Sequence, residues 1–179
     1  MRPLALLLAV ALGGAVVPAT QLRPPDVVFI ASSDPAVDAM LKIANVTKQD
    51  VVYDLGCGDG KIVIAAAKRY GARGVGIDID PQRIQEATQK ARDAGVAGKV
   101  TFRLGDILSD DVKIGEATVV TLYLLPSLNE RLRPKLWREL KPGTRVVSNS
   151  FDMGKAWPPE KTQRVEDTWI YFWKIPKKT

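Results

Sequence analysis

Hydrophobic residues recur along this chain in short runs that alternate with helical patterns. Runs rich in β-branched and apolar residues predict strands, and they fall at 51–54, 74–79, 100–104, 117–123 and 144–150. Between them, apolar positions three or four residues apart predict helices, at 33–46, 61–70, 82–94 and 128–140. Residues 107–115 fit neither pattern and predict an irregular crossing. Strands that alternate with helices are typical of a mostly parallel sheet covered on both faces.

The alternation of strand and helix stops after Phe151. Residues 152–162 contain a glycine and two adjacent prolines and predict a loop. Residues 163–166 and 169–175 then predict two strands joined by a tight turn at Asp167. The sequence therefore predicts a Rossmann-like α/β fold, with a mostly parallel sheet and a C-terminal antiparallel hairpin.

The N-terminus differs from the rest of the chain. Met1 and Arg2 precede an apolar run at 4–17, and small residues follow it up to Ala19. This order is typical of a signal peptide cleaved after Ala19, and an uncleaved membrane anchor is the alternative. The run is shorter than the roughly 20 apolar residues of a membrane span. We assign 1–19 to this segment, 20–32 to a linker that then packs on the domain, and 33–179 to one domain.

The central stretch is 51–61, V-V-Y-D-L-G-C-G-D-G-K. A predicted strand runs into Asp54, and Gly56, Gly58 and Gly60 alternate before the next helix begins. Glycine has no Cβ, so it permits a positive φ and a close approach of backbone to ligand. The helix start then offers unpaired N–H groups. This stretch therefore predicts a ligand-binding loop, and a tight turn without a ligand is the alternative.

The charges of this loop indicate which ligand it suits. A dinucleotide fingerprint requires a glycine at the sixth position from Gly56, where this chain has Lys61. Asp54 and Asp59 would also repel a pyrophosphate. Two carboxylates around the turn suit a ligand with an ammonium or sulfonium centre instead.

Carboxylates follow three successive predicted strands. Asp54, Asp78 and Asp106 each stand where a strand ends. In an open parallel sheet, ligands bind at the carboxyl ends of the strands, so we expect these side chains to line one cleft. The alternative for each is a helix N-cap, and this better explains Asp80 before Pro81.

The motif D-x-G-x-G-x-G after a strand resembles motif I of the class I S-adenosylmethionine (SAM)-dependent methyltransferases. The resemblance implies that SAM is the cofactor. It also implies that Asp54, Asp59 and the three glycines of the loop surround its methionyl end. Further residues follow from the resemblance: Asp78 on the ribose hydroxyls, Asp106 on the adenine amino group, and Ile79 and Ile107 against the adenine.

A narrower resemblance covers about 33–150, including V-G-I-D-I-D and V-T-L-Y-L-L-P-S-L-N-E-R-L. These segments are similar to the protein-lysine methyltransferases of the mitochondrial ATP synthase and the adenine nucleotide translocase, and to their prokaryotic relatives. The resemblance implies a protein substrate with a target lysine and places Tyr123 and Pro126 at the acceptor pocket. An ordinary aromatic at a strand end is the alternative for Tyr123. The chain departs from the family pattern at Cys57 and in the approach 31–32.

Other functions remain open. The chain could methylate a small molecule or RNA, or bind SAM without catalysis. No Asn-Pro-Pro-Tyr or Asp-Pro-Pro-Tyr follows the fourth strand, which counts against adenine, cytosine or glutamine amide acceptors. The basic residues at 131–141 are interrupted by acidic ones and favour a solvated face over a nucleic-acid site.

Composition narrows the chemistry. The 179 residues carry a net charge of +6, no histidine and one cysteine. An intrachain disulfide, a Ser-His or Cys-His nucleophile and most zinc sites are excluded, so we expect no metal. SAM is a cytosolic metabolite, and the N-terminal run at 4–17 therefore suggests two locations. The protein is either anchored in a membrane with its domain in the cytosol or exported after cleavage.

Overall fold

The computed structural model describes residue 24 and residues 30–177. The predicted signal peptide or anchor at 1–19 and most of the predicted linker at 20–32 lie outside the described residues. Within the described part, no helix is both long enough and apolar enough to cross a membrane.

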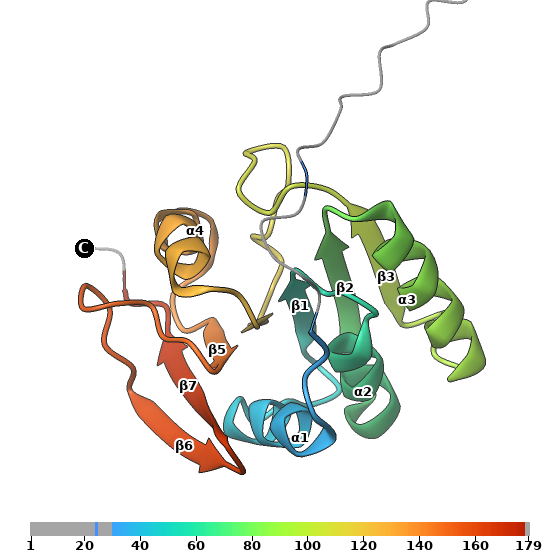
Figure 1. Cartoon of the computed structure of the whole chain (residues 1–179), viewed down its shortest axis with the longest axis horizontal. Helices are drawn as coiled ribbons and strands as arrows, with labels where there is room; N and C mark the ends of the chain where they lie inside the picture. The colour runs from blue at the N-terminus through green and yellow to red at the C-terminus, as the bar shows by residue number, and fades with distance from the viewer. Residues whose placement is uncertain (1–23, 25–29, 178–179) are drawn as a thin grey trace, which may run out of the picture.

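Seven strands form one mixed sheet in the order β3-β2-β1-β4-β5-β7-β6 (Figure 1). The first five run parallel, and β7 is antiparallel to both β5 and β6. The predicted fold class is therefore confirmed. The strands are β1 (Val51–Leu55), β2 (Arg73–Asp78), β3 (Val100–Leu104), β4 (Val119–Leu122), β5 (Arg145–Asn149), β6 (Lys161–Val165) and β7 (Thr168–Lys174).

The hairpin folds back so that its second strand, β7, enters the sheet beside β5. β7 reads T-W-I-Y-F-W-K, whereas β6 reads K-T-Q-R-V and is mostly exposed. The apolar strand lies between two neighbours in the sheet, and the polar strand forms the edge, where charged side chains discourage pairing with other chains.

Among residues 30–177, four helices lie close to the bounds that the sequence predicts. They are α1 (Asp34–Ile43), α2 (Lys61–Tyr70), α3 (Pro81–Asp93) and α4 (Pro126–Glu139). Ser33 caps α1 and Asp80 caps α3, each by accepting a backbone N–H. Gly71 ends α2 in the left-handed conformation. The first helix ends at Ile43, before the predicted Val46, because Asn45 has a φ of 48°.

The helices cover both faces of the sheet (Figure 1). One buried cluster joins α1, α2 and α3 to residues such as Val52 and Val147. The other joins α4 and the crossing at 107–115 to residues such as Tyr53 and Leu122. Alternate β1 residues therefore enter opposite cores, as the pleat requires.

The chain changes direction across the sheet at β1. β1 pairs with β2 on one side and with β4 on the other. After β1 the chain forms β2 and β3 on one side and then crosses back to form β4 on the other side. Such a switch point leaves a crevice beyond the carboxyl ends of the strands. The fold therefore places the loop after β1, the end of β2 and the end of β4 around one opening.

The expectation of a solvated basic face at 131–141 is wrong for Lys135 and Arg133. Lys135 is 4% exposed; its Nζ donates to Ser109 O and lies 3.3 Å from Glu139. Arg133 donates to Met153 O and lies over the Trp137 ring. The crossing 107–115 and the loop after β5 cover this side of α4, which the helix pattern alone does not reveal.

Three tryptophans pack together rather than forming an open cage. Ring centroids lie 5.5 Å apart for Trp137 and Trp157, and 5.7 Å apart for Trp157 and Trp173. Trp173 Nε1 also donates to Trp157 O at 2.9 Å. Trp169 is 46% exposed on the hairpin. Trp137, Trp157 and Trp173 are therefore packing residues.

Candidate active site

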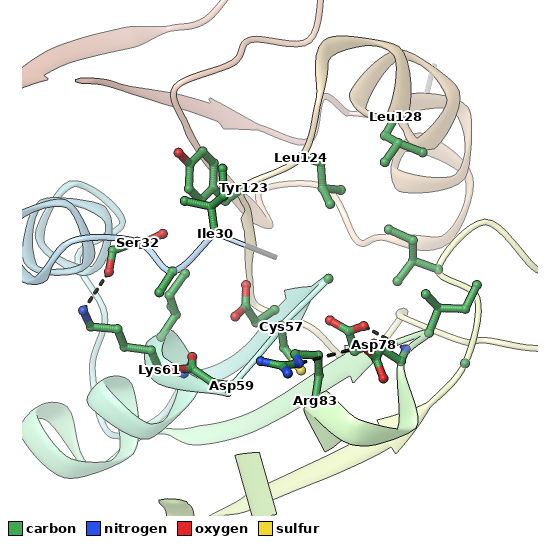
Figure 2. Close-up of a pocket in the computed structure, with 18 of the residues that line it drawn as sticks. Ile30, Ser32, Cys57, Asp59, Lys61, Asp78, Arg83, Tyr123, Leu124 and Leu128 are labelled. Carbon is green, nitrogen blue, oxygen red and sulfur yellow. Dashed lines mark hydrogen bonds and ion pairs between the residues drawn. The ribbon is translucent and has the colours of Figure 1, made fainter. Parts of the chain in front are cut away.

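A cavity opens at the crevice beside β1 and encloses ≈ 960 Å³, part of it open to solvent (Figure 2). Its wall is strongly acidic, with Lys61 and Arg83 as the cations among the lining residues. The lining carboxylates are Asp54, Asp59, Asp78, Asp80 and Asp106.

Most of the residues singled out in the sequence meet in this cavity. Those that line it are Asp54, Gly56, Asp59, Asp78, Ile79, Asp106, Ile107 and Tyr123. Gly58, Gly60 and Pro126 are not among its lining residues. Gly58 donates its N–H to Asp78, Gly60 precedes α2 as its cap, and Pro126 is the first residue of α4. Leu124 and Leu128 line the cavity on either side of Pro126 instead.

The glycine loop requires glycine at its first and last positions. Gly56 has a φ of 82°, and a Cβ there would lie 2.8 Å from Leu124 Cδ2. Gly60 has a φ of 77°, and its Cβ would lie 2.6 Å from the Phe102 ring. The N–H groups of Gly56 and Cys57 both donate to Ile77 O. The loop is thus held against β2, and a Cβ at Gly56 or Gly60 would collide with Leu124 or Phe102.

Asp54 is the most buried carboxylate of the cavity. It is 3% exposed, and Thr121 Oγ1 donates to its Oδ1 at 2.8 Å. The pKa of Asp54 is raised to about 7: burial is the largest cause, the Thr121 hydrogen bond opposes it, and the charges of Asp78 and Asp59 add to it. A cationic group placed beside this carboxylate would favour its charged form.

Asp78 joins the glycine loop to the end of β2. Its Oδ2 accepts the Gly58 N–H at 2.7 Å, and its Oδ1 accepts the Asp80 N–H at 3.0 Å. Each carboxylate oxygen has two acceptor positions, so both oxygens can still accept from a ligand diol. Asp106 Oδ1 likewise accepts the Leu108 N–H at 2.9 Å. These bonds fix both carboxylates at the rim of the cavity.

One end of the cavity is apolar. Ile30, Tyr123, Leu124 and Leu128 line the cavity on the side opposite Asp59 and Asp78 (Figure 2), and the Tyr123 ring stacks on Phe151 with centroids 6.4 Å apart. The structure therefore combines an acidic floor, which suits a cationic nucleoside, with an apolar end beside it.

Sequence reasoning missed one wall of this cavity. Residues 30–32 line it, although the sequence assigns them to the linker. Lys61 Nζ donates to Ser32 O at 2.7 Å, and Asn149 Nδ2 donates to Ser32 Oγ at 3.2 Å. Lys61 directly follows the glycine motif, so the sequence does draw attention to it. Asn149 is more than a hundred residues from Ser32, and no sequence pattern connects the two.

The sequence model of the ANTKMT methyltransferase domain matches residues 54–161. A protein-lysine N-methyltransferase of Saccharolobus islandicus is 46% identical over 144 residues, covering 80% of this chain and 88% of that protein. A mouse lysine N-methyltransferase of an ATP synthase subunit is 30% identical over 152 residues. That match covers 84% of this chain and 60% of the mouse protein.

The crystal structure of a similar protein indicates the methyl donor. The crystal structure of an RNA methyltransferase from Salinibacter ruber, in complex with S-adenosyl-L-homocysteine, is 53% identical, with a TM-score of 0.81. The match covers 84% of this chain and 96% of that one. The acidic cavity at the glycine loop fits the same nucleoside. The chain therefore belongs to the ANTKMT methyltransferase family and is a SAM-dependent methyltransferase.

Proposed function

We propose that this protein transfers a methyl group from SAM to the ε-amine of a lysine in a protein substrate. The observation that carries the proposal is the apolar end of the cavity, at Tyr123, Leu124, Leu128 and Ile30, directly beside the acidic floor. An apolar channel fits the methylene stem of a lysine. The Saccharolobus and mouse relatives, which are named as lysine methyltransferases, support the same acceptor.

The residues that would bind SAM are assigned from the positions of their side chains in the cavity. We assign Asp78 to the ribose hydroxyls, Asp106 to the adenine amino group, and Ile79 and Ile107 to the adenine faces. Asp54 is assigned to the methionyl ammonium, because it is the most buried carboxylate of the cavity and stands at the start of the glycine loop. The loop backbone then approaches the methionyl end, and Asp59 adds negative charge there.

Bound SAM supplies an activated methyl group on a sulfonium centre. The protein's own task is to align the lysine amine with that group and to exclude water. Leu124 and Leu128 supply an apolar surface, and desolvation there favours the neutral amine, which is the nucleophile. We place Tyr123 beside the amine, where its position at the end of β4 lets the phenol orient the acceptor.

RNA is the main alternative acceptor, because the Salinibacter relative is named as an RNA methyltransferase. Two features of this chain oppose it. The cavity wall carries more carboxylates than cations and would repel phosphate. On α4, Arg133, Lys135 and Arg138 bind Met153 O, Ser109 O and Asp110 in this protein. These cations are therefore not presented together as a phosphate-binding face.

The acceptor can be tested with labelled SAM and a lysate of the host. After transfer, samples are digested with protease or with ribonuclease, and methylated lysine is sought by mass spectrometry. Label that resists ribonuclease and maps to lysine supports the proposal. Label that only ribonuclease releases, or that stays in small molecules, refutes it. Tight SAM binding without any transfer would identify a catalytically inactive SAM-binding protein.

We also propose that residues 4–17 hold the protein at a membrane with the catalytic domain in the cytosol, where SAM is made. These residues lie outside the described structure, and the proposal depends on their apolar sequence alone. A reporter active only in the cytosol, fused to the C-terminus, tests it. We expect the reporter to be active and to sediment with membranes. An inactive reporter, on a chain shortened by 19 residues, would indicate export after cleavage.

A further inference from the structure

The wall formed by residues 30–32 is held from two directions. Lys61, the first residue of α2, donates its Nζ to Ser32 O at 2.7 Å and lies 3.0 Å from Asp34 Oδ1. Asn149, at the end of β5, donates its Nδ2 to Ser32 Oγ at 3.2 Å. Asn149 is itself fixed, because its Oδ1 accepts from Thr168 at 2.8 Å and from Ser150 at 3.2 Å. Ser32 is 7% exposed and is therefore a fixed, buried part of the wall.

The α-carboxylate of SAM needs a partner that the aspartates of the cavity cannot provide. SAM carries one anionic group, the α-carboxylate of its methionyl end. Five aspartates line the cavity, so this group needs positive charge or donors close by. The cations among the lining residues are Lys61 and Arg83. Arg83 lies 2.8 Å from Glu86 and 3.8 Å from Asp80, so two carboxylates already draw on its charge.

The orientation of SAM in the cavity identifies Lys61 as the cation for its α-carboxylate. The ribose is assigned to Asp78, at the end of β2, and the adenine to Asp106, just after β3, so the methionyl end points towards β1 and β4. Figure 2 shows Lys61 and Ser32 together on the side of the cavity away from Asp78, with Arg83 near Asp78. Lys61 is thus the lining cation at the methionyl end.

We propose that the Lys61 ammonium and the Ser32 hydroxyl bind the α-carboxylate of SAM, and that Asn149 positions Ser32 for this contact. Lys61 Nζ has three N–H donors, and Ser32 O and Asp34 engage two of them. Asp34 is 73% exposed, so solvent screens its charge. The Ser32 oxygen accepts from Asn149 and keeps its own O–H to donate. The two side chains therefore offer an ionic and a neutral donor on one wall.

A ligand that lacks only this carboxylate tests the proposal directly. Decarboxylated SAM keeps the adenosine, the sulfonium and the amine. We expect Lys61→Met to weaken SAM binding by about 10- to 100-fold, the scale of a charge-assisted hydrogen bond. Binding of decarboxylated SAM should weaken by less than about 3-fold, because no carboxylate contact is lost. Calorimetry on the full-length protein without an acceptor measures both constants.

Removal of a cation from an acidic cavity also changes its general charge, and a matched variant separates that effect. Lys90 on α3 pairs with Asp59 at 2.5 Å but is not among the lining residues. We expect Lys90→Met to change SAM and decarboxylated SAM binding in nearly the same ratio. Lys61→Arg keeps the charge and should restore part of the discrimination between the two ligands.

The serine contact has its own pair of variants. Ser32→Ala should weaken SAM binding by about 3- to 10-fold, the scale of a neutral hydrogen bond, and Ser32→Thr should restore it. The inference is overturned if Lys61→Met shifts the ratio of the two affinities no more than Lys90→Met does. It depends on SAM as the donor and not on the lysine acceptor, because no acceptor is present. Failure here would leave the acceptor proposal standing, and the reverse also holds.

Discussion

Asp54 should make the unliganded protein less stable as pH rises, and its replacement by asparagine isolates this effect. Its pKa is about 7 in the folded protein and 3.8 in its ordinary state. A raised carboxyl pKa means that the folded state binds the proton more tightly than the unfolded state. Its contribution to stability is therefore fully present below pH 3.8 and is lost as pH rises through about 7.

The size of this effect follows from the shift. Between pH 5 and pH 8, the Asp54 contribution should fall by roughly 2–3 kcal/mol, at about 1.36 kcal/mol per pKa unit. An asparagine side chain cannot ionise but keeps an acceptor for the Thr121 hydroxyl. In urea titrations from pH 5 to pH 8, the free energy of unfolding of Asp54→Asn should therefore gain roughly 2–3 kcal/mol relative to wild type.

The same variant should bind SAM more weakly, because the carboxylate assigned to the methionyl ammonium is lost. Wild-type affinity should rise between pH 6 and pH 8 as Asp54 ionises, and the variant should lose this dependence. Asp50→Asn is the control with the opposite sign. Burial raises the pKa of Asp50, but hydrogen bonds from Thr118 and Thr47 and the charge of Arg145 together hold it below its ordinary value. Its contribution is lost as pH falls, below pH 5.

Parallel curves for wild type and Asp54→Asn between pH 5 and pH 8 would refute the reasoning. They would show that Asp54 is ionised throughout this range despite its burial. Thr121→Val provides a further check, since the hydroxyl lowers the pKa of Asp54. Its loss should extend the decline in stability to higher pH.

Substitutions at Asp78, Gly56 and Tyr123 test other parts of the site. Asp78→Ala should weaken SAM binding by roughly 1.5–3 kcal/mol in calorimetry, and Asp78→Asn by less, because one acceptor for the Gly58 N–H or the ribose remains; an unchanged constant in a folded variant removes the ribose assignment. Gly56→Ala should lower the free energy of unfolding by about 1–2 kcal/mol or more in urea titration, from its left-handed φ and the contact with Leu124. Gly98→Ala, with no atom within 4 Å of the added Cβ, should change it little. Tyr123→Phe should lower kcat for lysine methylation about 10-fold or more while SAM affinity stays within about 2-fold; equal kcat values would leave Tyr123 as a packing residue only.

The donor half of the site was predictable because its residues are close together in the sequence or follow strand ends. Asp54 and the three glycines are read from one motif, and Asp78 and Asp106 stand at the ends of strands that a parallel sheet must bring to one edge. The roles of Gly58 and Gly60 could not be separated from that of Gly56 by sequence. Only the folded loop shows that Gly58 bonds to Asp78, while Gly56 faces the cavity.

The sequence by itself determined the order of strands and helices, the helix caps and the acidic edge of the sheet, because each depends on neighbouring residues or on a short repeat. Tertiary structure alone decided which strand of the hairpin lies inside, why Lys135 is buried, and how Ser32, Lys61 and Asn149 form one wall. The wall joins Ser32 to residues 29 and 117 positions away along the chain. No local pattern encodes such a contact, since it exists only when the sheet has brought the segments together.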